Sequence, residues 1–88
     1  MKYTVTFPID CPFSDYMRYG KAQGKSFVRT INNVEYAARL YNRANNTNIH
    51  FHSVRTFDNG RVGDNIVAIM YFYDDNDNTW VIVIREYD

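Results

Sequence analysis

Residues 66–84, IVAIMYFYDDNDNTWVIVI, decide the fold, because this stretch predicts two strands joined by a polar turn at residues 74–78. Both faces of both strands are apolar: Ile66, Ala68, Met70 and Phe72 alternate with Val67, Ile69, Tyr71 and Tyr73, and Trp80, Ile82 and Ile84 alternate with Val81 and Val83. A strand that is covered on one side only should alternate apolar with polar residues. We therefore expect a cover on both faces, the second being residues 10–24, a second copy of the chain or a partner.

Two further stretches predict strands that extend this pair. Residues 48–57 run into Asn59 and Gly60, the preferred centre of a two-residue type I′ turn, and so form a hairpin with the strand that starts near residue 66. Residues 2–7, KYTVTF, alternate polar with apolar side chains until Pro8 ends the strand. The sheet therefore has three to four strands.

The clearest helix signal lies in residues 31–46, INNVEYAARLYNRANN. Asn32 as N-cap and Glu35 three residues later match the spacing of a capping box, and the pair Asn45-Asn46 ends the pattern. One stripe of the helix is apolar: Val34, Ala37, Ala38, Tyr41 and Ala44. Residues 25–31 predict either a short edge strand or a lead into this helix, and residues 9–26 a loop with one or two helical turns that Ser14 caps.

These elements predict an α+β fold for one small domain spanning residues 1–88. Its antiparallel sheet of three to four strands combines a C-terminal β-meander with the N-terminal strand, and one main helix packs on one face. A domain of this length has a thin core and little room for an enclosed active site.

The composition is that of a folded, cytoplasmic protein that needs no disulfides. The single cysteine, Cys11, is expected to carry a reduced thiol, and neither a signal peptide nor a membrane-spanning segment is indicated. The net charge is zero, which argues against a simple phosphate-binding protein. However, residues 1–44 hold seven of the ten Lys and Arg residues, whereas residues 45–88 hold seven of the ten Asp and Glu residues, so a basic and an acidic side are possible.

Two histidines provide the only hint of metal chemistry. His50 and His52 stand two apart in a predicted strand, where both side chains leave the same face. A metal site needs a third and usually a fourth ligand, and no other residue lies at a spacing that specifies a known motif. We interpret the pair as solvated or hydrogen-bonded residues, and a metal-dependent enzyme built on them remains the weaker alternative.

No other pattern predicts catalysis or a cofactor. The acidic run from Asp75 resembles a calcium loop in its odd-numbered positions, but Trp80 stands where such a loop requires glycine, so the run predicts a hairpin turn. Phosphate-loop, dinucleotide-binding and nucleophile-elbow patterns are not found in the chain. We therefore predict a protein that is not an enzyme and binds no cofactor.

Nucleic-acid binding is one alternative function. Cationic and aromatic residues interleave in the N-terminal half, a mixture suited to phosphates and bases: Arg18, Lys21, Lys25, Arg29, Arg39 and Arg43 with Tyr16, Tyr19, Phe27, Tyr36 and Tyr41. Arg39 and Arg43 stand one helical turn apart and share a face. The zero net charge and the lack of an RNA-recognition or helix-turn-helix signature count against this function.

Binding to a protein is the leading hypothesis, because eight tyrosines, six phenylalanines and one tryptophan exceed what so small a core can bury. In size and composition the chain resembles the small inhibitors made by phages and mobile elements, anti-CRISPR proteins among them, which implies stoichiometric binding to a protein target such as a nucleic-acid-binding complex. A homodimer is the remaining possibility. The residues predicted to bind are two helix arginines, two strand tyrosines and three turn aspartates: Arg39, Arg43, Tyr71, Tyr73, Asp74, Asp75 and Asp77.

Overall fold

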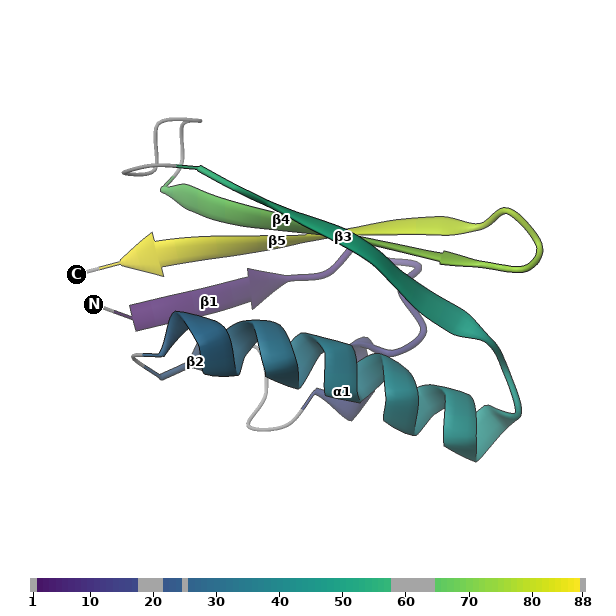
Figure 1. Ribbon diagram of the computed structural model, residues 1–88. Coiled ribbons are helices and arrows are strands. Elements are labelled where there is room, and N and C mark those ends of the chain that lie inside the picture. Colours follow the sequence, from purple (N-terminus) through teal and green to yellow (C-terminus); the bar gives the residue numbers. More distant parts are fainter. Residues whose placement is uncertain (1, 18–21, 25, 58–64, 88) are drawn as a thin grey trace.

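The computed structural model describes residues 2–17, 22–24, 26–57 and 65–87, and it confirms the predicted α+β fold (Figure 1). All strand pairs are antiparallel, and the sheet order is β2-β1-β5-β4-β3. The four longer strands are the predicted ones, whereas the two-residue β2 at the edge was not expected. The strands are β1 (Lys2–Thr6), β2 (Ala22–Gln23), β3 (Ile49–Thr56), β4 (Ile66–Asp74) and β5 (Thr79–Tyr87).

The register of the strands assigns each residue of the meander to one face of the sheet. Residues that stand opposite each other in an antiparallel pair point to the same side, so Ala68 joins Ile84, whereas Ile69 joins Val83 on the other face. A β-bulge between Ile66 and Ala68 places Ile66 opposite Arg85. The prediction that Ile66 shares a face with Ala68 is therefore wrong. The predicted turn at Asn59 and Gly60 lies outside the described residues.

The main helix, α1, spans Phe27–Asn45 and begins six residues earlier than the predicted cap at Asn32 implied. Ser26 is its N-cap, because the Ser26 side chain accepts a hydrogen bond from the backbone N–H of Arg29 at 3.2 Å. The prediction that Asn32 caps the helix is wrong, since packing of the first turn against the sheet outweighs the β-propensity of residues 27–31, and the ring of Phe27 contacts that of Tyr3. The end of the helix is as predicted, with Asn46 in the left-handed conformation.

The apolar stripe of α1 packs against one face of the sheet, here called the covered face (Figure 1). Val34 and Ala37 are fully buried, Ala38 nearly so, and Tyr41 packs partly against the same core. Ala44 is exposed, which contradicts its predicted place in the stripe, because the helix has turned that position away from the sheet by its last turn. The buried sheet side chains that the register places on the covered face are Tyr3, Val5, Ile49, Ala68, Met70, Phe72, Trp80, Ile82 and Ile84.

The segment between β1 and β2 also packs on the covered face. Its short 3-10 helix, η1 (Ser14–Tyr16), starts at Ser14, so this serine is not the cap that was predicted. Just before it, Phe13 is fully buried, with its ring centroid 5.0 Å from that of Phe72 and 6.4 Å from that of Trp80. The described part of residues 10–24 therefore thickens the core beneath α1 and leaves the opposite side of β4 and β5 without a cover from it.

Candidate binding surface

The uncovered side of the sheet, here called the open face, carries a ladder of apolar side chains on its two central strands. Tyr71 stands opposite Val81 and Ile69 opposite Val83, in two adjacent rows. Val81 retains 42% of its accessible surface and Tyr73 40%, whereas Ile82, the neighbour of Val81 on the covered face, retains none. In the described ranges, no element lies over these rows (Figure 1). The open face therefore presents to solvent apolar side chains of the kind that usually lie in a protein interior.

Polar residues frame these apolar rows. Ser53 stands beside Tyr71 on the edge strand β3, and Thr6 stands beside Val83 on β1. At one end of the face, a hollow of about 460 Å³ lies among Tyr71, Tyr73 and Val81, with further lining residues that include His52, Ser53 and Thr79. An apolar centre with a polar rim is the usual anatomy of a protein-binding surface.

Charge is distributed unevenly along the strands of the open face. Arg55 stands in the row of Ile69, and Arg85 stands opposite both Ile66 and Thr4. The Arg85 guanidinium donates a hydrogen bond of 2.9 Å to the hydroxyl of Thr6. By register, Glu86 and Asp74 belong to the covered side, opposite Tyr3 and Ile49, so the described strands place cations but no carboxylate on the open face.

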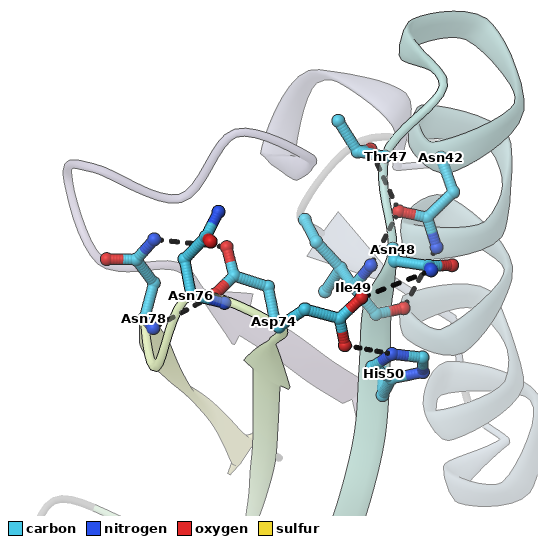
Figure 2. Close-up of polar contacts among 9 residues, drawn as sticks. Asn42, Thr47, Asn48, Ile49, His50, Asp74, Asn76 and Asn78 are labelled. Atoms are coloured by element: carbon cyan, nitrogen blue, oxygen red, sulfur yellow. Dashed lines mark hydrogen bonds and ion pairs between the residues drawn. The ribbon is translucent and has the colours of Figure 1, made fainter.

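The acidic turn, residues 74–78, lies at the Tyr73 end of the face and is built around one of its aspartates (Figure 2). The Asp74 carboxylate accepts hydrogen bonds from the backbone N–H groups of Asn76 and Asn78 and from the side-chain amide of Asn78. The side-chain bond from Asn78 is the main reason why the pKa of Asp74 lies below its ordinary value. Asp74 thus shapes the turn, whereas Asp75 and Asp77 are exposed to solvent.

His50 and His52 lie beside the tyrosines of this surface. The two imidazole centroids are 5.1 and 6.0 Å from that of Tyr73. The Nε2 atom of His50 lies 3.2 Å from Asp75, and Nδ1 of His52 lies 2.8 Å from the hydroxyl of Ser53. Residues 2–17, 22–24, 26–57 and 65–87 contain no group of three His, Cys, Asp or Glu side chains that could hold a metal ion. The hydrogen-bonded interpretation thus describes the geometry of both histidines.

Asn42 is a structural residue that the sequence analysis did not identify (Figure 2). Its side-chain amide oxygen accepts hydrogen bonds from the backbone N–H of Ile49 and the hydroxyl of Thr47, and its amide nitrogen donates to the carbonyl of Ile49. This clamp joins the last turn of α1 to the first residue of β3. The neighbouring Asn48 donates to Asp75 at 3.2 Å and ties β3 to the acidic turn. Part of the high asparagine content therefore serves the fold, a role that local sequence does not reveal.

Besides the three aspartates of the acidic turn, the predicted binding residues fall into two separate groups. Arg39 and Arg43 are exposed on the side of α1 that faces away from its buried stripe, whereas Tyr71 and Tyr73 belong to the open face of the sheet. Arg39 and Tyr73 both border one hollow between α1 and β3. Arg18, Lys21 and Lys25 lie outside the described residues, so the predicted basic half cannot be assembled as one surface.

Arg39 and Arg43 belong to a longer row on the outer side of α1, here called the helix stripe. Its other members, Arg29, Asn32 and Tyr36, follow the three- and four-residue spacing of a single helix face, and all five are exposed. Tyr36 retains 41% of its accessible surface. Comparisons of the chain with protein-family models, curated proteins and solved structures find no match. Among the described helices, none is long and apolar enough to span a membrane.

Proposed function

We propose that this chain is a non-enzymatic binding protein that associates stoichiometrically with a protein through its open face. The observation that carries the proposal is the apolar ladder on the two central strands, formed by the exposed Val81 and the half-buried Tyr71, Ile69 and Val83. Small soluble proteins cover such strands, and a contiguous apolar patch with a polar rim marks an interaction surface.

The residue types of the open face also favour a protein as the bound molecule. Tyrosine and arginine dominate the energetics of protein interfaces, and here Tyr71 and Tyr73 lie at one end of the surface and Arg85 at the other. Val81 and Val83 between them offer no hydrogen bond to a small polar ligand. The surface is therefore suited to a large apolar partner with a charged rim.

We assign to this protein the role of a cytoplasmic inhibitor directed against a host defence complex. Inhibitors of this kind are made by phages or mobile elements. Inhibition by stoichiometric binding requires a complementary surface and no catalytic group. The exposed carboxylates of Asp75 and Asp77 beside the open face would attract a target whose own surface is basic because it binds nucleic acid.

The test is a pull-down from host lysate, with and without nuclease, read by mass spectrometry. Three baits are compared: the unmodified chain, Val81→Glu on the open face and Tyr36→Glu on the helix stripe, two residues of nearly equal exposure. We expect one protein, resistant to nuclease, to be captured by the unmodified chain and by Tyr36→Glu but lost with Val81→Glu. Circular dichroism checks that all three are folded, and equal capture by both variants would contradict the proposal.

Nucleic-acid binding through the helix stripe is the second candidate function. The arginines Arg29, Arg39 and Arg43 are exposed around Tyr36 along roughly 21 Å of helix, at a rise of about 1.5 Å per residue, which suits several phosphates and one stacked base. Binding of a labelled single-stranded oligonucleotide would then weaken steeply with added salt and disappear in R39E/R43E. Binding that ignores both salt and this double substitution would rule out the helix stripe.

A further inference from the structure

The open face changes sign along its strands, which gives it a definite polarity. At one end lies the acidic turn with Asp75 and Asp77, followed by the row that contains Tyr73 and Thr79. The two apolar rows come next, and at the other end stand Arg85 and, one row further, Lys2 opposite Tyr87. The seven residue-to-residue steps from Asn78 to Arg85 separate these ends by roughly 24 Å at about 3.4 Å per step.

This order is complementary to itself when the strand direction is reversed. A two-fold axis that crosses the strands between the two apolar rows places Tyr71 and Val81 of one copy over Ile69 and Val83 of the other. The same axis brings the acidic turn of each copy to the cationic end of its partner and Tyr73 to the level of Arg85. An axis parallel to the strands would instead bring like charges together.

We propose that, in the isolated protein, the open face is occupied by a second copy of this chain, packed face to face with its strands reversed. The inference rests on the proposed function, because both require the open face to bind protein. The described strands place only cations on the open face itself, and the carboxylates that match them lie at its far end. A second copy with its strands reversed therefore presents the complementary charges, which favours it as the occupant. The chain as a whole is neutral, so two copies approach without net repulsion.

The size of the face sets the expected strength of this dimer. Four strands about 4.8 Å apart, of which the central pair β4 and β5 is nine residues long, make a surface of at most roughly 19 by 30 Å, which is at the small end of stable protein interfaces. We therefore expect dissociation in the micromolar range, so that a tighter-binding target displaces the second copy by mass action. The two helix stripes then point outward from opposite sides of the dimer, because α1 lies on the covered face of each copy (Figure 1).

Complementary charge exchange tests the predicted orientation. Arg85→Glu alters the cationic end, and the double variant Asp75→Lys with Asn76→Lys alters the acidic turn. Asp77 is left unchanged because its backbone φ of 63° disfavours lysine, and Asp74 because it holds the turn. Analytical ultracentrifugation across a concentration series measures each variant alone and the equimolar mixture.

In the reversed arrangement each variant alone brings like charges together twice, whereas the mixed dimer restores both opposite-charge contacts. We expect each variant to dimerise about tenfold more weakly than the unmodified chain, and the mixture to recover the original affinity. The matched control is R39E/R43E on the helix stripe, which should dimerise like the unmodified chain. Thermal unfolding of each variant identifies any loss that is due to misfolding.

Two results would overturn the inference. One is a chain that stays monomeric up to about 1 mM, well above the expected dissociation constant. The other is a mixture of the two charge variants that dimerises no better than either alone. Failure of the dimer is distinguishable from failure of the proposed function, because a monomer that captures a host protein dependent on Val81 retains the function and loses only the second copy. A chain that neither dimerises nor loses its captured protein with Val81→Glu contradicts both.

Discussion

The covered and open faces of β4 and β5 have nearly the same apolar content but differ in their surroundings. Ile82 is fully buried under the core that α1 and Phe13 complete, whereas the adjacent Val81 keeps 42% of its accessible surface. The described residues contain one main helix, and the described loop that could have served the second face packs beneath the helix instead. The apolar pattern of a strand thus indicates how many of its faces need to be buried. The tertiary structure shows how many of those faces the described part of the chain covers.

The largest expected effect is on the covered face, at Phe13. Phe13→Ala should lower the free energy of unfolding by about 3–5 kcal/mol, because it leaves a cavity between Phe72 and Trp80. Urea denaturation measures this loss. Ile9→Ala, in the same segment but fully exposed, is the control and should change stability by less than about 0.5 kcal/mol. A loss of stability for Phe13→Ala as small as that for Ile9→Ala would show that the segment does not complete the core of the covered face.

Adjacent residues of β5 provide a direct comparison of the two faces. Ile82→Thr should destabilise the chain by about 2–4 kcal/mol, since it buries a hydroxyl and removes apolar volume from the core. Val81→Thr should cost less than about 0.5 kcal/mol in the monomer, because this side chain already meets water. The measurement is chemical denaturation at low protein concentration. A large cost at Val81 in dilute monomer would contradict the open face.

The cap of the helix that forms the cover has a smaller expected effect. Ser26→Ala removes the acceptor for the backbone N–H of Arg29 and should cost about 1 kcal/mol. Asn32→Ala is the matched control, because the sequence pattern assigned the cap to Asn32, whereas the structure places it inside α1. Thermal unfolding of the two variants decides where the helix begins. A larger loss of stability for Asn32→Ala than for Ser26→Ala would favour the cap at Asn32.

The smallest expected effect is on the pH dependence of stability, and it arises at the acidic turn that joins β4 and β5. The pKa of Asp74 lies below its ordinary value of 3.8 through the hydrogen bond from Asn78. A depressed pKa adds stability that is fully present above the ordinary value and is lost as the pH falls through the lowered one. Asp74→Ala should therefore flatten the decline in stability below about pH 4. Urea midpoints at pH 7 and pH 3 measure this, and an unchanged decline would contradict the assignment.

Most elements of the fold could be predicted, because their signals are local. The alternation in β1, the apolar runs of β4 and β5, the polar turn after Asp74 and the asparagines that end α1 all act through nearest neighbours in the chain. The errors arose where tertiary packing overrides local preference. Phe27 enters a helix because it can pack on Tyr3, and a bulge that no local pattern announces moves Ile66 to the other face.

The candidate site was predictable only in part. The two-sided apolar pattern already placed Tyr71 and Tyr73 together on one face of their strand, since the period of a strand is two. That Arg39 and Arg43 lie on another side of the molecule, and that Asp74 serves the turn, depends on how α1 packs and on hydrogen bonds of Asn76 and Asn78. The clamp by Asn42 joins residues seven apart and follows no simple spacing rule.

By itself, the sequence determined the α+β class, the meander and the presence of two apolar faces, because strand and helix periods are properties of the chain. Only the tertiary structure decided which face is covered, since that depends on where α1 and the segment around Phe13 pack. Which segment buries a face of the sheet depends on how distant parts of the chain pack. The sequence shows the apolar segments but not where they lie in space. The open face and its charge polarity result from that packing.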